Sequence, residues 1–205
     1  YWDAILVQAW ESTATLLLPF GVILVTTLIA QLEFKNNAWK QVCTTPQSMG
    51  SIFSFKLLVI LVMLLQFFLI FNLGLWAEPY FAAWLNHDLP YPQATFPWMK
   101  YLKTSALFYI SSLPVVAIQY WISLRFGNFL ISIGTGLGMV FLSLFLFRWE
   151  FGYLIPYTHN FYQFFQLSGH TSLSKEINLT FLSMLFFSVI TGFSLLSFTF
   201  RNQRG

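Results

Sequence analysis

The chain has 205 residues, of which 57% are hydrophobic, 20% are aromatic and only 8% are charged. Soluble domains carry roughly 25% charged residues, so this composition excludes an ordinary soluble enzyme, a disulfide-stabilised scaffold and a polar low-complexity chain. The single cysteine, Cys43, cannot form an intrachain disulfide, and the net charge of +3 is too small and too dispersed to indicate nucleic-acid binding. The composition predicts an integral membrane protein.

Five intervals of the chain contain no Asp, Glu, Lys or Arg and are long enough to cross a bilayer. A membrane-spanning helix needs about 20 apolar residues, and a charged side chain at the bilayer centre costs about 2.5–3.5 kcal/mol. The intervals, each rich in Leu, Ile, Val and Phe, are residues 12–32, 57–77, 104–124, 126–147 and 177–200. We therefore predict an all-α membrane protein with five spanning helices in a single transmembrane domain over residues 1–205.

Prolines interrupt two of these spans. Pro19 and Gly21 lie in the first span and Pro114 lies in the third. Such breaks free backbone groups that neighbouring helices must satisfy, so each is either a simple kink or a bend that lines a substrate path.

The polar groups of the spans are few and uncharged. Away from the ends of the intervals, Gln66, Asn72 and Gln119 are the amides, and the others are hydroxyls of Ser, Thr and Tyr. Ion-coupled carriers usually place a buried Asp, Glu, Lys or His in the membrane, so this pattern argues against such a carrier. A path that includes Gln66 and Gln119 would suit an amphiphilic substrate better than an ion.

The segment between the first two spans, residues 34–56, is long enough to hold a short helix. Asn36 or Asn37 is a suitable N-cap for a helix that begins near Ala38, and Pro46 would end it. This helix is either a contact for a cytoplasmic partner or an amphipathic anchor without a partner.

The fourth span contains three glycines at alternate positions, in the order Gly134-Thr-Gly136-Leu-Gly138. The span is apolar and no Lys follows, so this is not a nucleotide-binding loop, and no phosphate-binding loop occurs elsewhere in the chain. Gly134 and Gly138 are spaced as a small-xxx-small surface, which predicts close helix packing within the chain or between two copies.

The uncharged segment 151–174 is rich in polar residues, which argues against a sixth span and favours an interfacial or re-entrant segment before the last span. It contains His159 and His170, and Glu150 and Glu176 flank it. These histidines are either solvated loop residues or part of a metal or proton-relay site. The second alternative would make the protein a membrane-embedded enzyme.

Basic residues are unequally divided between the two ends of the predicted spans. One end carries a single acid, Glu33, and six bases, which are Lys35, Lys40, Lys56, Arg125, Arg201 and Arg204. The other end carries four bases and six acids. We therefore expect residues 34–56 in the cytoplasm and the loops 78–103 and 148–176 outside. The odd number of spans and the non-Met first residue lead us to expect a further span upstream.

At residues 33–56 the chain resembles the membrane subunits of type-two ABC exporters, in particular the small permeases of lantibiotic-immunity and bacitracin-type transporters. The residues that carry this resemblance are Glu33, Asn37, Trp39, Lys40, Pro46 and Lys56. The resemblance extends more weakly along the whole chain. It implies six spans with both termini in the cytoplasm, so the five seen here would be the second to the sixth.

The resemblance also implies partners and a function. Residues 36–48 would form a coupling helix that contacts an ABC ATP-binding subunit, and that subunit would hold ATP and Mg²⁺, so no cofactor is expected in this chain. A second permease subunit, identical or paralogous, would pair with it in a bacterial cell membrane, surrounded by lipid. The expected activity is ATP-driven export of an amphipathic peptide, antibiotic or lipid-like molecule. A non-transporting accessory subunit is an alternative.

Overall fold

The computed structural model describes residues 2–35, 48–87, 91–169 and 178–202, and within these ranges every regular element is a helix. Five of the helices are long and apolar enough to cross a membrane. They are Trp2–Leu32, Met49–Leu85, Trp98–Arg125, Phe129–Leu146 and Leu179–Thr199. The predicted all-α membrane fold with five spanning helices is thereby confirmed.

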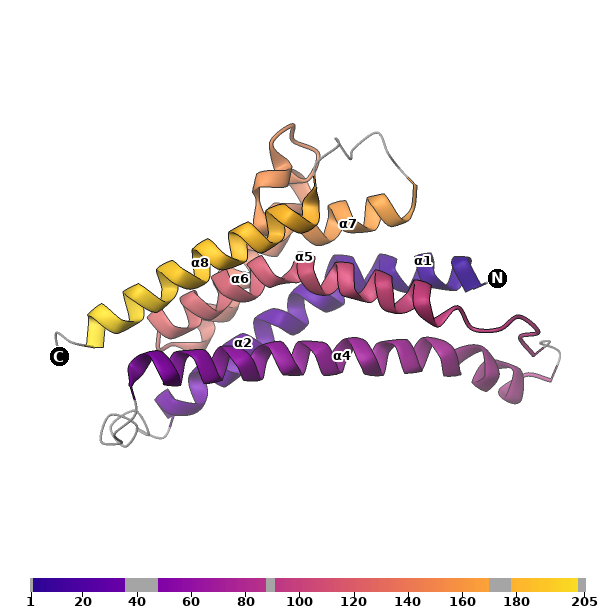
Figure 1. The fold of residues 1–205 in the computed structure, drawn as a ribbon, viewed down its shortest axis with the longest axis horizontal. Coiled ribbons are helices and arrows are strands. Elements are labelled where there is room, and N and C mark those ends of the chain that lie inside the picture. Colours follow the sequence, from indigo (N-terminus) through magenta and orange to yellow (C-terminus); the bar gives the residue numbers. More distant parts are fainter. Residues whose placement is uncertain (1, 36–47, 88–90, 170–177, 203–205) are drawn as a thin grey trace.

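The first spanning helix is a composite with a wide turn in its middle. It consists of α1 (Trp2–Ser12), a π-helical turn, η1 (Thr13–Leu17), and α2 (Leu18–Lys35). Pro19 has no N–H and its ring would clash with the carbonyl one turn earlier, so the backbone widens before it, and the Leu18 N–H bonds to the Thr13 carbonyl. The helix changes direction between α1 and α2 (Figure 1).

The other spanning helices are α4 (Met49–Leu85), α5 (Trp98–Arg125), α6 (Phe129–Leu146) and α8 (Leu179–Asn202). Most of them extend beyond the charge-free intervals. α4, for example, begins before Lys56 and continues past Glu78. A charge marks the depth at which apolar surroundings end, but the backbone hydrogen bonds of a helix continue into the polar layer beyond it.

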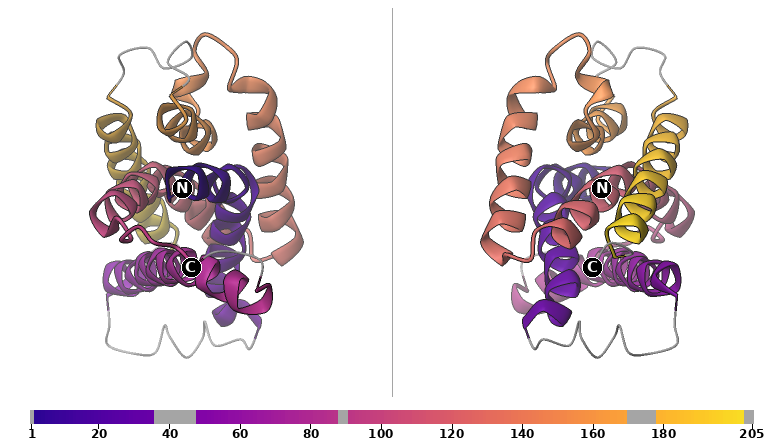
Figure 2. Two further views of the ribbon diagram at one scale, coloured as in Figure 1. Left: turned by 90° about the vertical axis from the view of Figure 1, so that its right-hand side faces the viewer. Right: turned by 90° about the vertical axis from the view of Figure 1, so that its left-hand side faces the viewer.

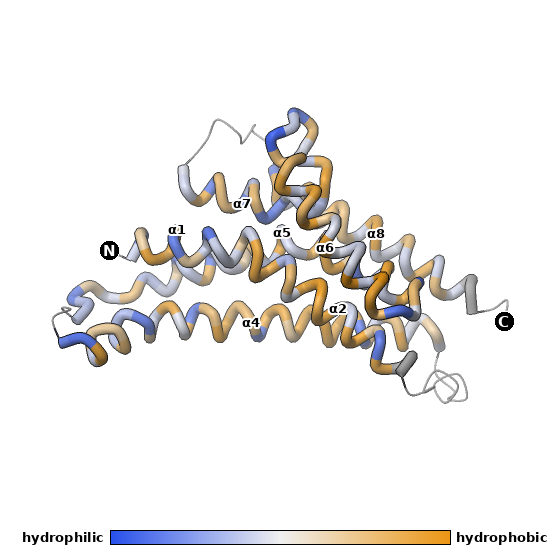
Figure 3. The backbone as a smooth tube through the Cα atoms, turned by 180° about the vertical axis from the view of Figure 1, so that it is seen from behind, coloured by the Kyte–Doolittle hydropathy of each residue, from blue (hydrophilic) through white to orange (hydrophobic). Residues whose placement is uncertain are grey.

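α5 is the central helix of the bundle. It contacts α2, α4, α6, α7 and α8 (Figure 1). Its one internal proline, Pro114, and most of its hydroxyl and amide side chains are buried. α4 contacts α5, and many of its leucines and phenylalanines are exposed. Most of the residues along α4 are hydrophobic (Figure 3). An apolar surface of this kind is what lipid tails contact in a membrane protein.

The chain between α6 and α8 forms three short helices rather than a span. They are η2 (Gly152–Leu154), η3 (Pro156–Thr158) and α7 (His159–Leu167). α7 lies between α6 and α8 in both end views (Figure 2), and its first five residues are buried. The described part of the segment 151–174 therefore does not cross the membrane, and it covers one side of α5.

Candidate functional site

A cluster of uncharged polar side chains lies where α2, α5, α6 and η3 meet. The Gln119 amide Nε2 donates to the Ser132 carbonyl at 2.7 Å, and its Oε1 accepts from the Tyr157 hydroxyl at 3.1 Å. The hydroxyls of Thr27 and Ser123 lie 3.1 Å and 2.5 Å from that of Ser132. All five side chains are at most 1% exposed. We call these five residues the Gln119 cluster; their mutual hydrogen bonds offset the cost of burying them away from water.

Gly136 permits this close approach. A Cβ atom at Gly136 would lie 2.8 Å from the Gln119 Oε1 and 2.9 Å from two carbon atoms of Ile23. These distances are shorter than ordinary contacts, so α6 can approach α2 and α5 this closely only with a glycine at this position.

The predicted packing surface at Gly134 and Gly138 is therefore wrong as a contact within the chain. Both residues are exposed, and a Cβ at either would meet nothing within 4 Å. The glycine that packs is the one between them, because it faces the bundle while Gly134 and Gly138 lie about 160° away around the helix axis. Contact between two copies through Gly134 and Gly138 stays a prediction.

α7 is attached to α5 by a second polar contact. The Asn160 Oδ1 accepts hydrogen bonds from the hydroxyls of Ser111 and Ser112, at 2.8 Å and 3.2 Å. All three side chains are at most 1% exposed. The short helix is therefore held in the bundle by specific buried hydrogen bonds as well as by aromatic packing.

His159 lies inside the protein, which contradicts its interpretation as a solvated loop residue. Its Nε2 is 2.9 Å from the Tyr153 carbonyl and its Nδ1 is 2.8 Å from the Ser183 hydroxyl. A carbonyl only accepts, so Nε2 carries the proton and Nδ1 accepts from Ser183. Burial lowers the pKa of His159 to about 4, although the bond to the Tyr153 carbonyl opposes that shift. The imidazole is neutral at pH 7 and both its nitrogens have partners.

The other members of the proposed histidine site do not converge on His159 in the described part of the chain. Glu150 is exposed, and His170 and Glu176 lie outside the described residues. Across the described ranges, no three His, Cys, Asp or Glu side chains are grouped so that they could hold a metal ion. His159 therefore acts there as a buried contact between α7 and α8.

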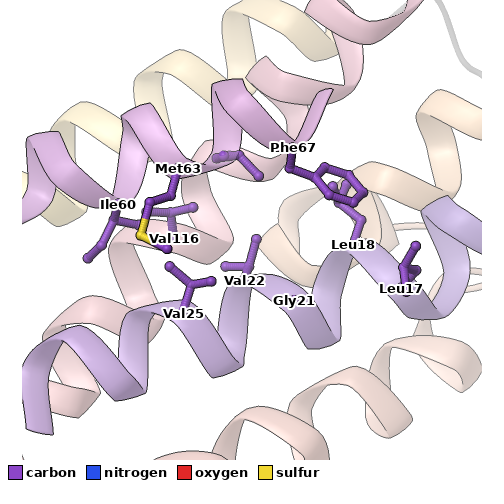
Figure 4. Close-up of a pocket in the computed structure, with 10 residues that line it drawn as sticks. Leu17, Leu18, Gly21, Val22, Val25, Ile60, Met63, Phe67 and Val116 are labelled. Carbon is purple, nitrogen blue, oxygen red and sulfur yellow. The ribbon is translucent and has the colours of Figure 1, made fainter. Parts of the chain in front are cut away.

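An apolar cavity of about 80 Å³ lies beside the bend in the first spanning helix. Its walls come from α4, from Val116 of α5, and from Leu18, Gly21 and Val22 of α2 (Figure 4). In the close-up, Val22 and Val25 of α2 point toward α4. Gly21 therefore lines a space, as a path residue would, but the side chains that line this space are all apolar.

The remaining predicted site residues are dispersed. Pro114 and Gln119 are buried in α5, whereas Gln66 is exposed on α4. Glu33 falls in the last turn of α2, and Lys56 is half-buried in the second turn of α4. Asn37, Trp39, Lys40 and Pro46, with most of the predicted coupling segment 36–48, lie outside the described residues. A contact with an ATP-binding subunit at these positions stays a prediction.

Sequence reasoning missed most of the interior contacts. The glycine triplet in the sequence includes Gly136, but the sequence does not show which of the three glycines faces the bundle. Tyr157 and Asn160 lie in two short helices, and the sequence pattern there did not predict where these helices pack. A better signal would have been the hydroxyls and amides of α5 at positions 105, 111, 112, 119 and 123, because polar residues in a span need polar partners.

Comparison with known proteins identifies the family. A model described as "ABC-2 family transporter protein" matches residues 2–147, which is more than half of the chain. The match includes every helix from α1 to α6 and the segment between α2 and α4. No curated protein and no solved structure matches the chain.

Proposed function

The chain belongs to the ABC-2 transporter family, and we propose that it is the permease of an ATP-driven exporter for an amphipathic peptide, antibiotic or lipid-like molecule. Membership makes it a multi-pass membrane subunit that works with ABC ATP-binding subunits. The closer assignment to lantibiotic-immunity or bacitracin-type permeases, and the direction of transport, belong to the proposal.

The observation that carries the proposal is the family match across both α2 and α4 with the segment that joins them. α2 ends at Lys35 and α4 begins at Met49 at the same end of the bundle, where α5 also ends at Arg125 (Figure 1). This supports a contact between residues 36–48 and the ATP-binding subunit, which would hold ATP and Mg²⁺. In a bacterial cell membrane, that end would face the cytoplasm.

The interior of the bundle supports an amphipathic substrate rather than an ion. The Gln119 cluster is made of one amide and four hydroxyls that hydrogen-bond to one another, and the cavity beside Gly21 is apolar. Ion carriers need ionisable or carbonyl ligands along a path. Two permease subunits, identical or paralogous, would enclose such a path between them.

The first experiment is affinity purification of the tagged full-length protein in mild detergent, followed by identification of the chains that copurify. We expect a stoichiometric ABC ATP-binding subunit, and we expect its loss when residues 36–48 are replaced by a Gly/Ser segment of equal length. A protein that purifies without any nucleotide-binding partner would contradict the proposal.

Coupling is tested by a matched pair of tryptophan substitutions. Trp39→Ala should abolish stimulation of the ATPase by the permease without affecting membrane insertion, because Trp39 lies in the proposed contact. Trp84→Ala changes an exposed tryptophan near the opposite end of α4 and should leave the stimulation unchanged. Equal effects of the two substitutions would remove Trp39 from the contact.

A further inference from the structure

A second cavity lies between α4 and α5, on the outer surface of the bundle. Its volume is about 230 Å³, and its lining is apolar except for Asn72, Ser105 and the hydroxyl of Tyr109. Leu65, Leu69 and Leu102 on its rim are about half exposed, so the cavity opens sideways toward the space that lipid occupies. Cavities of about 150 Å³ already hold a benzene-sized group, so this one has room for part of an apolar chain.

The amide of Asn72 is only half satisfied. Its Nδ2 donates to the Phe68 carbonyl and to the Ser105 hydroxyl, each at 2.7 Å. Its Oδ1 is buried and accepts no hydrogen bond from the residues that the structure describes. A flipped amide would place Oδ1 against the Phe68 carbonyl, and two acceptors repel, so the Phe68 carbonyl determines which atom of Asn72 lacks a partner.

An acceptor without a donor is unusual inside a protein and more costly in a bilayer, where water is scarce. Asn72 lies deep in the membrane: with a rise of about 1.5 Å per residue, it is about 9 Å along α4 from Glu78 and about 24 Å from Lys56. Asn72 lines the cavity, but its Oδ1 is covered, so a molecule that enters from the bilayer with a hydrogen-bond donor would satisfy that atom once the side chain shifts to expose it.

We propose that the cavity between α4 and α5 binds an amphiphile from the bilayer, whose chain fills the apolar space and whose hydroxyl or amide N–H donates to the Asn72 Oδ1. Binding itself does not require the transport activity. That the occupant is a transported substrate rests on the proposed function, and it would restrict that substrate to molecules with a donor near an apolar chain.

The test uses the full-length protein in lipid nanodiscs and two photoactivatable probes. One is a C16 alcohol with a diazirine in its chain, and the other is its methyl ether, which has the same chain but no donor. The alcohol should label peptides of α4 and α5 that line the cavity roughly fivefold more than the ether, which corresponds to one net hydrogen bond. Unlabelled hexadecanol should compete with it.

Two variants locate the site. Asn72→Leu removes the acceptor and should lower labelling by the alcohol to the level of the ether. Ala106→Phe fills the cavity without changing Asn72, should abolish labelling by both probes, and keeps the test decisive if Asn72→Leu does not fold. The control is Thr135→Val, which removes an exposed hydroxyl on α6. It should change labelling by neither the alcohol nor the ether.

Three results would overturn the proposal. They are equal labelling by alcohol and ether, labelling that persists in Ala106→Phe, and crosslinks from the lining residues to a second protein chain, which would make this face a protein interface. Labelling as expected in nanodiscs would support the binding site. If neither Asn72→Leu nor Ala106→Phe then changed the substrate-stimulated ATPase activity, the site would have no role in transport.

Discussion

α4 and α5 run side by side but have opposite characters. Among the five spanning helices that the described residues form, α4 is the most hydrophobic and largely exposed, whereas α5 is the least hydrophobic and the most buried. In a soluble protein the order would be reversed. Lipid tails are as apolar as Leu, so nothing drives Leu and Phe of α4 inward, while the hydroxyls and amides of α5 must find polar partners inside the bundle.

The two glutamines of these helices show the same contrast. Gln119 on α5 is buried with both ends of its amide engaged, whereas Gln66 on α4 is exposed. In this protein, polarity in a span therefore identifies the helix at the centre, and four experiments test that comparison.

The largest expected effect is acid destabilisation of the segment that covers α5. Because the pKa of His159 is about 4 in the folded protein and near 6.5 in the unfolded chain, the unfolded state binds the proton more readily between these values. The free energy of unfolding should therefore fall as pH drops from about 6.5 to 4, by roughly 3 kcal/mol for this group. Thermal unfolding in detergent across this range measures it.

The matched variant is His159→Gln, which cannot titrate. It should be less stable than the native protein at pH 7.5, and its stability should depend less on pH between 6.5 and 4. An unchanged pH dependence in this variant would show that other groups cause the acid sensitivity.

The next effect distinguishes the glycines of α6. Gly136→Ala should destabilise the protein by about 2 kcal/mol, because its Cβ would overlap with Gln119 and Ile23. Gly134→Ala and Gly138→Ala meet nothing within 4 Å and should be neutral or slightly stabilising. Melting temperatures of the three variants measure the difference, and three equal values would contradict the close packing of Gly136 against Gln119 and Ile23. If Gly134→Ala and Gly138→Ala instead prevented two copies of the chain from associating, these glycines would form a surface between subunits.

A smaller effect compares the two glutamines. Gln119→Leu should cost about 1–2 kcal/mol, because it leaves the Tyr157 hydroxyl and groups around Ser132 without a partner. Gln66→Leu should be neutral or stabilising, because it removes an exposed amide from the apolar surface of α4. The free energy of unfolding of both variants, measured in detergent and in lipid bilayers, tests this difference. A larger loss for Gln66→Leu would reverse the assignment of interior and exterior.

The smallest effect concerns the bend in the first spanning helix. Gly21→Ala adds a Cβ that meets nothing within 4 Å and favours helical backbone by up to about 1 kcal/mol, so the melting temperature should rise slightly. A fall would mean that the bend at Pro19 needs the freedom of Gly21.

The sequence alone determined the class of the protein and the five spans that the described residues form, because the cost of burying a charge in lipid acts on each segment without reference to the others. The family resemblance at residues 33–56 also came from local pattern, and the match over residues 2–147 supports it at the level of the ABC-2 family.

Only the tertiary structure decided which groups meet. That Gly136 packs while Gly134 and Gly138 do not depends on how α6 is rotated, and the depth of His159 depends on where α7 is inserted. Likewise, Asn72 and Gln119 look alike in the sequence, but the Gln119 amide is paired at both ends, whereas the Asn72 Oδ1 has no donor among the described residues. Hydropathy measures transfer into lipid, whereas rotation and depth arise from contacts between residues far apart in the chain, which no single segment contains.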